Sequence, residues 1–480
     1  MSAPMLLLFV VAYFILLIGV AWYTSRNSNN DSFFIGNKSS HWALVAFGMI
    51  GTSLSGVTFI SVPGTVASNG FGYFQVVMGY FIGYFVITYI LLPLYYRLNL
   101  TSIYNYLEQR FGNYTHKTGA LFFIISRVLG ATLRLYLVIN VLQIFILDSM
   151  GISFHVTALI ILMMILLYTF KGGVKTIVYT DTLQTLFMLM ALVVCIFYVM
   201  GEMGLSPASA IQQLSDAGYS KIFNSDFNDK KFFLKQIIGG AFITISMTGL
   251  DQEMMQKNIS VKTLHGSQKN MLTFSSVMVL VNLMFLFLGG LLYLFASFKG
   301  LSVKGDDLFP TLAINHFPPI ISIIFIIGLI SALFPSADGA ITALTSSFCI
   351  DMLGIQKDKI SGEEKKSRTR MIVHLSFALI FLFFVFFFRE LNNKSVIQIL
   401  LDIAGYTYGP LLGLFAFGIL TKRIMNDKLS PVVCLSAPGL CYFVQYFSPS
   451  LFGSYQIGIE MLLINGAVTF AGLWALSRKP

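Results

Sequence analysis

Residues 48–59, GMIGTSLSGVTF, decide the fold of this chain, because they interrupt an apolar run that extends from 43 to 68. Glycine, serine and threonine crowd into this stretch, so its helix propensity is low, and Pro63-Gly64 follows closely. A helix that unwinds inside a membrane frees backbone carbonyls, which protein, water or an ion must then satisfy. Small residues also let membrane helices pack closely, so this stretch alone fits either a binding site or simple packing.

A second cluster of the same kind lies in the apolar run 236–256, five apolar runs later, and contains Thr244, Ser246, Thr248 and Gly249. Interrupted first helices in two successive five-helix halves are the pattern expected of an inverted-repeat transporter. Two clusters in register therefore favour a transporter over packing alone.

Composition indicates an all-α integral membrane protein. Hydrophobic residues make up 56% of the 480 positions and charged residues only 11%, against roughly 25% charged in soluble domains. Apolar runs long enough to cross about 30 Å of hydrocarbon recur along the chain, and the first lacks a signal-peptide cleavage pattern. We predict about thirteen transmembrane helices, near 5–23, 43–68, 73–96, 118–147, 155–170, 176–201, 236–256, 271–297, 319–350, 371–388, 395–420, 429–448 and 455–477.

Basic residues predict the orientation. With the N-terminus outside, inward loops hold 21 of the 31 Lys and Arg and outward loops hold 8. The positive-inside rule therefore predicts an outside N-terminus and a cytoplasmic C-terminus. The net charge of +10 follows from this topology, so we expect no nucleic-acid partner. The four cysteines all fall in apolar runs and show no metal spacing: Cys195, Cys349, Cys434 and Cys441.

Asp181 is an ionisable residue within the apolar run 176–201, where a charge is costly and by default functional. It follows the pair Gly172-Gly173 and belongs to a Thr-Asp-x-x-Gln segment that ends at Gln184. This arrangement resembles the signature of the sodium:solute symporters, the family of sodium-coupled sugar, proline, monocarboxylate and sialic acid carriers. The resemblance covers roughly 5–425 and implies a LeuT-like fold and sodium-driven uptake.

Further segments support the resemblance. Asp251-Gln252 and Gln256-Lys257 resemble the family's end of the sixth core helix, and Gly409-Pro410 resembles the Gly-Pro of the tenth. Glu253 and Lys257 are spaced for an i,i+4 salt bridge. The implied organisation is an extra helix and cytoplasmic loop (1–42), a first inverted repeat (43–203), an extracellular loop (204–232), a second repeat (233–423) and two C-terminal helices (424–480).

The resemblance implies a sodium site between the first and eighth core helices. Sodium prefers several oxygen ligands, which half-helix ends supply. In the eighth helix the chain departs from the family, because Pro335 replaces one of two hydroxyl residues, and Asp338 stands where relatives with a second sodium place a hydroxyl. We expect one or two sodium ions, the first held by Gly51, Leu54, Ala332, Pro335 and Ser336, and the second by Asp181 and Asp338. The two carboxylates could instead share a proton, or each could form a structural hydrogen-bonded lock.

The solute is predicted from Arg134, which lies near mid-membrane and needs a carboxylate partner or an anionic substrate. If Arg134 binds the substrate, the solute is an acidic sugar such as sialic acid, or another carboxylate, and we favour this interpretation. If Arg134 instead pairs with Asp402, the solute is a neutral sugar or polyol. The candidate substrate-binding residues are Ser53, Ser55, Thr58, Arg134, Thr244, Met247 and Asp402.

We therefore expect a sodium-coupled symporter, multi-pass in the plasma (inner) membrane and monomeric, whose partners are a small solute, sodium and the lipid bilayer. A symporter-like membrane sensor is an alternative from another class, which the lack of an output domain before Pro480 disfavours. We do not expect an enzyme, since no nucleophile and base pair or metal cluster is recognisable.

Overall fold

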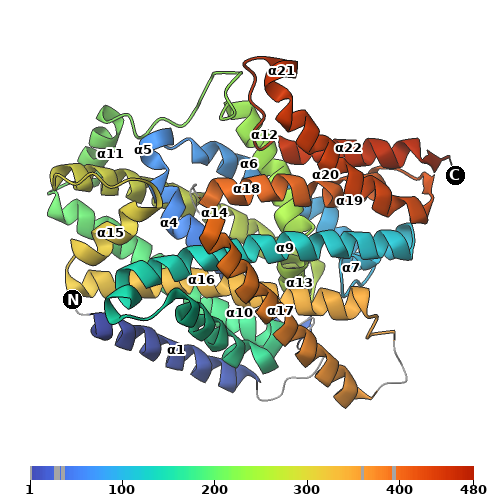
Figure 1. Ribbon diagram of the computed structural model, residues 1–480, viewed down its shortest axis with the longest axis horizontal. Coiled ribbons are helices and arrows are strands. Elements are labelled where there is room, and N and C mark those ends of the chain that lie inside the picture. The colour runs from blue at the N-terminus through green and yellow to red at the C-terminus, as the bar shows by residue number, and fades with distance from the viewer. Residues whose placement is uncertain (1–2, 26–32, 34–37, 358–361, 392–395, 480) are drawn as a thin grey trace.

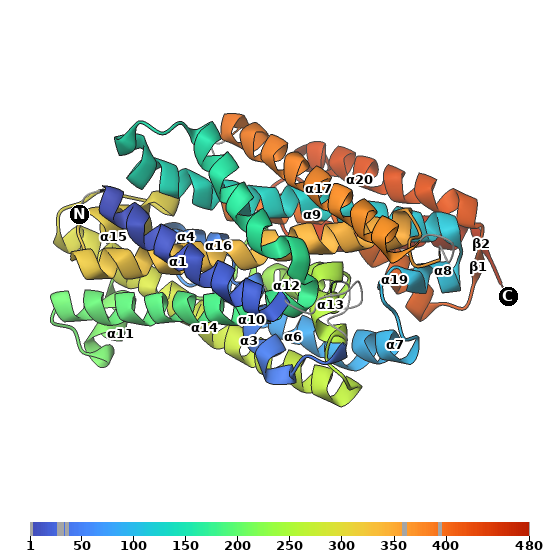
Figure 2. The same cartoon turned by 90° about the horizontal axis from the view of Figure 1, so that it is seen from below.

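The computed structural model describes residues 3–25, 33, 38–357, 362–391 and 396–479. Most helices lie roughly along the long axis of the molecule, and the N- and C-termini lie at opposite ends of that axis (Figures 1 and 2). The α-helices are α1 (Ala3–Ser25), α3 (Trp42–Ser53), α4 (Gly56–Gly64), α5 (Val66–Asn69), α6 (Tyr73–Val86), α7 (Leu92–Arg97), α8 (Asn105–Arg110), α9 (Asn113–Leu142), α10 (Phe154–Glu202), α11 (Pro207–Asp216), α12 (Phe233–Thr244), α13 (Gln252–Ile259), α14 (Leu264–Phe298), α15 (Leu308–Asn315), α16 (Pro319–Ser347), α17 (Glu363–Leu391), α18 (Val396–Thr407), α19 (Gly409–Leu420), α20 (Ser430–Tyr446), α21 (Ser448–Phe452) and α22 (Met461–Ala475).

Short π and 3-10 turns extend or join these helices, and the chain closes with a two-stranded antiparallel sheet. The π turns are η2 (Ile87–Leu91), η3 (Gln143–Leu147), η5 (Ile245–Gly249) and η7 (Phe348–Met352), and the 3-10 turns are η4 (Asp148–Met150), η6 (Gly305–Asp307) and η8 (Asp427–Leu429). The strands β1 (Ile424–Met425) and β2 (Ser477–Arg478) pair Ile424 with Arg478.

The described part of the chain contains eight helices long and apolar enough to cross a membrane, and three bent helix pairs that also qualify. Two shorter apolar helices, Phe154–Leu167 and Met461–Ala475, coincide with the remaining predicted runs. Each of the thirteen apolar segments predicted from the sequence therefore contains a helix or a bent helix pair, and the integral membrane class is confirmed.

The predicted interruption at 48–59 is a break between α3 and α4, whose axes differ by 53°. Leu54 leaves helical geometry with φ −83° and ψ 71°, and Ser55 is extended with ψ 174°. The second interruption separates α12 and η5 from α13 by 64°, and a third bends α18 against α19 by 42°. Both clusters of small and hydroxyl residues thus mark real breaks.

Two tyrosines satisfy carbonyls released by the second break. The Tyr95 hydroxyl donates to the Gly249 carbonyl at 2.8 Å, and the Tyr104 hydroxyl donates to the Leu250 carbonyl at 2.8 Å. The Asp251 carboxylate caps α13 by accepting from the backbone N–H groups of Glu253 and Met254. These bonds hold the start of α13 in place, because each closes a backbone group that the bilayer would leave unsatisfied.

The helix α10 contains two of the predicted spans, joined at Gly173, whose φ of 54° favours glycine. A Cβ at this position would lie 2.3 Å from the Cα of Phe33, so the close approach also requires glycine. The second half of α10 packs against α16, α3 and α1, at the centre of the bundle. The predicted outer segment at 204–232 contains the short helix α11 and a loop.

Candidate ion and substrate sites

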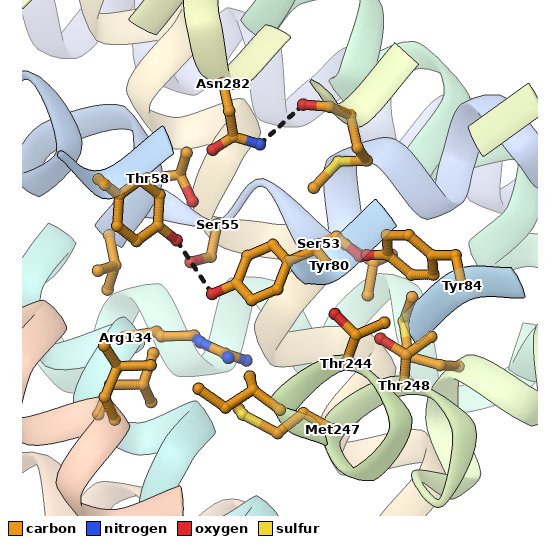
Figure 3. A pocket seen from close by; sticks show the side chains of 18 of the residues that line it. Ser53, Ser55, Thr58, Tyr80, Tyr84, Arg134, Thr244, Met247, Thr248 and Asn282 are labelled. Carbon is orange, nitrogen blue, oxygen red and sulfur yellow. Dashed lines mark hydrogen bonds between the residues drawn. The ribbon is translucent and has the colours of Figure 1, made fainter. Parts of the chain in front are cut away.

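A polar cavity lies beside the break between α3 and α4. Its walls come from α3, α4, α6, α9, α12, η5, α13, α14 and α18, and its volume is about 790 Å³, including its opening to solvent. Six of the seven predicted substrate-binding residues line it: Ser53, Ser55, Thr58, Arg134, Thr244 and Met247. Figure 3 shows the Arg134 side chain pointing into this space below Ser55 and Tyr80.

The seventh predicted residue, Asp402, does not line the cavity. Its neighbours Leu400 and Leu401 do, while Asp402 is on an exposed face of α18. Among the described residues no ion pair joins Arg134 to Asp402. Successive residues of a helix point about 100° apart. The position in the sequence therefore did not decide which of Leu400, Leu401 and Asp402 faces the cavity.

Arg134 and Arg127 line the same cavity but differ in their partners. Arg127 forms an ion pair with Glu253, and its Nη1 lies 3.6 Å from the Asp251 carboxylate. The Nε of Arg134 is buried and has no hydrogen-bond partner among the described residues. No Asp or Glu is among the described residues that line the cavity. The guanidinium of Arg134 therefore faces the cavity with no carboxylate among the described lining residues (Figure 3).

Sequence reasoning missed three tyrosines of α6 that also line the cavity, Tyr73, Tyr80 and Tyr84. The hydroxyls of Tyr73 and Tyr80 lie 3.2 Å apart (Figure 3). Their spacing of seven and four residues places them along one face of a helix, and this periodicity was the available signal. Thr248 and Asn282 add further hydrogen-bonding groups.

The predicted sodium residues lie where the break in α3 and α4 meets α16. Gly51, Leu54, Ala332, Pro335 and Ser336 are all buried, and α16 is in contact with both α3 and α4. Pro335 has no N–H, so the carbonyl of Ser331 one turn earlier loses its helical donor. The Ser336 hydroxyl donates to the Leu333 carbonyl at 2.8 Å, which leaves lone pairs on its oxygen. The segment thus supplies carbonyl and hydroxyl oxygens, the ligands suited to a hard cation.

Asp181 has a partner that the sequence did not predict. The Lys257 ammonium donates to the Asp181 carboxylate at 2.7 Å and to the Thr52 hydroxyl at 2.6 Å. It also lies 3.4 Å from Glu253, so the predicted i,i+4 pair is present. Thr52 in turn lies 3.1 Å from the same Asp181 oxygen. This cluster joins α3, α10 and α13 at one buried point.

Glycine lets α3 approach Asp181 closely. A Cβ at Gly48 would lie 3.2 Å from the Cβ of Asp181, and one at Gly51 would lie 2.3 Å from the Thr185 hydroxyl. The small residues of the interrupted run therefore allow close packing of α3 against α10, and they also lie at the helix break. Both interpretations of these residues, close packing and a helix break, apply.

Asp338 lies at the same level of the bundle as Asp181. A Cβ at Gly328 would lie 2.3 Å from the Cβ of Ala191, so these two residues meet where α16 crosses α10. Because α11, which follows α10, and α15, which precedes α16, lie at the same end of the molecule, the two helices run in opposite directions (Figures 1 and 2). Asp181 precedes Ala191 by ten residues and Asp338 follows Gly328 by ten, so both lie in the same direction from this contact, and both are completely buried. A second cation between them stays a prediction.

The remaining motif residues hold α13 in position. Gln252 accepts from the Ile103 N–H at 3.0 Å and donates to the Thr101 carbonyl at 3.1 Å. Gln256 donates to the Ser346 hydroxyl of α16 at 3.1 Å. These contacts anchor α13 to the loop before α8 and to α16.

Two broken helices around a polar cavity, with buried charges beside them, define a secondary transporter of LeuT-like fold. The sequence profile of the sodium:solute symporter family matches residues 33–428. The chain belongs to this family, and it is a sodium-coupled symporter with sodium as the coupling ion and a small-molecule solute as cargo.

Similar proteins include two sialic acid carriers. The chain is 22% identical to the sodium/sialic acid symporter SiaT of Proteus mirabilis strain HI4320, over 97% of this chain and 94% of that protein. It is 24% identical to the sodium/sialic acid symporter NanT of Aliivibrio fischeri, over 95% and 90% of the two chains. The mouse sodium-coupled monocarboxylate transporter 1 is 26% identical over 82% of this chain and 64% of its own length.

Solved structures confirm the fold. A substrate-bound, outward-open Na+-coupled sialic acid symporter superposes with a TM-score of 0.83 at 19% identity, covering 99% of both chains. Mhp1, a transporter of the nucleobase-cation-symport-1 family, superposes with a TM-score of 0.57 at 12% identity, covering 93% of each chain.

Proposed function

We propose that this symporter imports an acidic sugar of the sialic acid class, with Arg134 binding the solute carboxylate. The observation that carries the proposal is the half-buried Arg134, whose Nε is buried without a hydrogen-bond partner, in a cavity whose described lining residues include no carboxylate side chain. A guanidinium recognises a carboxylate through paired, charge-assisted hydrogen bonds. The sialic acid symporters among the similar proteins support the same class of solute.

The rest of the cavity suits the hydroxyl groups of a sugar. Ser53, Ser55, Thr58 and Thr244 bring hydroxyls from the two broken helices, and the tyrosines of α6 add phenols. Each of these groups can both donate and accept, as a sugar hydroxyl can. Met247 and Leu401 supply apolar surface beside them. Such a mixture favours a polyhydroxy acid over a purely apolar carboxylate.

We propose that sodium binds to oxygens contributed by Gly51, Leu54, Ala332, Pro335 and Ser336. Gly51 and Leu54 belong to the same broken segment as Ser53 and Ser55, which line the substrate cavity. A bound ion that orders this segment also orders the substrate hydroxyls, so each ligand raises affinity for the other. This shared segment gives coupling between ion and solute.

We further propose a monomer in the plasma (inner) membrane with its N-terminus outside and its C-terminus cytoplasmic, on the distribution of basic loops. The proposed boundaries of the two repeats are 43–203 and 233–423. A cysteine placed at Ser477 and tested with an impermeant thiol reagent in intact cells checks the orientation. Labelling from outside would contradict it.

The solute is tested by thermal shift of the purified protein against sialic acids, neutral sugars and monocarboxylates, each in sodium and in potassium. We expect stabilisation by a sialic acid only when sodium is present. Stabilisation by a neutral sugar and not by its acidic counterpart would overturn the proposed solute.

A further inference from the structure

We infer that the Lys257 ammonium is the resident cation of Asp181, so that the carrier binds one sodium ion, at the broken helix, in each cycle. The inference rests on the proposed sodium site and deepens it by fixing the ion stoichiometry. The Lys257 side chain then occupies the position beside Asp181 that a second sodium ion would otherwise occupy.

The Lys257 ammonium has acceptors for all its protons. An ammonium has three donors, and the oxygens around it are the Asp181 carboxylate at 2.7 Å, the Thr52 hydroxyl at 2.6 Å and the Glu253 carboxylate at 3.4 Å. Its side chain is 3% exposed, and that of Asp181 is 0% exposed. A cation already occupies this part of the core, and its hydrogen bonds are complete.

Lys257 and Thr52 both contact Oδ2 of Asp181, while Oδ1 of the same carboxylate is buried without a hydrogen-bond partner among the described residues. A sodium ion at either oxygen would share this single negative charge with the ammonium. Two cations at one carboxylate repel, and the displaced Lys257 would need another buried anion. The nearest, Glu253, already forms an ion pair with Arg127 through its other oxygen. Leaving a buried charge without a partner is strongly unfavourable.

The hydrogen bonds of Lys257 also join the two halves of the fold. Lys257 lies on α13, which continues the broken helix of the second half, whereas Thr52 lies in the broken helix of the first half. Asp181 lies on α10 between them. The ammonium therefore links the two interrupted helices directly, through Thr52, and also through Asp181. A free ion at this position would leave it after each transport cycle, whereas the lysine stays.

The test is direct counting of sodium ions bound to the purified full-length protein with radioactive sodium. We expect one ion for the unmodified protein and two for Lys257→Met, which removes the ammonium and leaves the oxygens of Asp181 and Thr52 for a second sodium. Lys257→Arg keeps the charge and should bind one. The double variant Lys257→Met/Asp181→Asn should also return to one.

Lys235→Met is the matched control, because Lys235 is another buried lysine, located 3.9 Å from Glu460 and on a different element. It should bind one ion. Two ions bound to the unmodified protein, or one bound to folded Lys257→Met, would overturn the inference. Absence of any bound sodium in the unmodified protein would instead contradict the proposed sodium site.

Asp181→Asn gives a second route if Lys257→Met does not fold. The inference predicts one bound sodium with nearly unchanged affinity, because Asp181 is not a sodium ligand. A site that held two ions would lose one in this variant, and that result would overturn the inference.

Discussion

Arg134 follows Arg127 by seven residues on α9, and both side chains line one cavity, yet among the described residues only Arg127 has carboxylate partners. The two arginines, on one face of α9, thus differ in their surroundings. Arg127 joins α9 to α13, whereas Arg134 faces the space where solute would bind.

Arg134→Lys should weaken binding of an acidic solute by about tenfold to a hundredfold, because a hydrogen bond to a charged group contributes about 1.5–3 kcal/mol. A lysine keeps the charge and loses the planar pair of donors. Solute titration by calorimetry in saturating sodium measures the change. Sodium affinity without solute should stay the same, and an unchanged solute affinity would reject the role of Arg134.

Arg127→Met should destabilise the protein by about 3–5 kcal/mol, because it leaves Glu253 and Asp251 buried without their arginine. Thermal unfolding in detergent measures this loss. The double variant Arg127→Met/Glu253→Gln should be less destabilised than the single one, since it removes one of the two stranded charges and leaves only Asp251. Equal melting temperatures of the unmodified protein and Arg127→Met would show that the pair contributes nothing.

Gly51→Ala should destabilise the protein by about 1–3 kcal/mol, the usual range for overpacking. The added Cβ would lie 2.3 Å from the Thr185 hydroxyl but 3.5 Å from its Cβ, so Thr185→Ala removes the clash. The double variant Gly51→Ala/Thr185→Ala should therefore recover most of the lost stability.

Gly19→Ala is the control for this pair, because no atom lies within 4 Å of a Cβ built on Gly19. Its melting temperature should match that of the unmodified protein. If Gly51→Ala also melts at that temperature, the close contact between α3 and α10 is not required.

Ser336→Ala should reduce sodium affinity by about tenfold, equivalent to about 1.4 kcal/mol for one lost oxygen ligand. Sodium stabilises the folded protein by mass action, so the midpoint of its thermal-shift titration should move to higher concentration. Potassium and choline should give no shift in either protein. Equal shifts in all three salts would contradict the sodium site.

Tyr80→Phe should weaken solute binding by roughly twofold to tenfold, because a neutral hydrogen bond contributes about 0.5–1.5 kcal/mol. Its hydroxyl lies 3.2 Å from that of Tyr73 inside the cavity. Calorimetry with the solute in sodium measures the change, and Tyr442→Phe on the exposed face of α20 serves as control. A loss of the same size in both variants would place the effect outside the cavity.

The sequence by itself determined the helices, their interruptions and the family. These are local properties, since the length of an apolar run decides whether a helix can cross the bilayer, and a cluster of glycine and hydroxyl residues lowers helix propensity where it stands. The break at Leu54 and that between Gly249 and Asp251 lie inside the predicted stretches. Arg134 was also selected from the sequence as a candidate binding residue, and it lines the cavity. The reason is that a charged side chain at mid-membrane is costly unless it has a functional partner.

Only the tertiary structure decided which side chains meet. A membrane helix is apolar on most of its surface, so periodicity does not show which face turns inward, and Asp402 was assigned to the cavity although Leu400 and Leu401 line it. Lys257 was expected to pair within its own helix, and packing also brings it to Asp181, which is 76 residues away in the chain. Contacts between distant segments depend on how the helices cross, and that follows from the packing of the whole bundle.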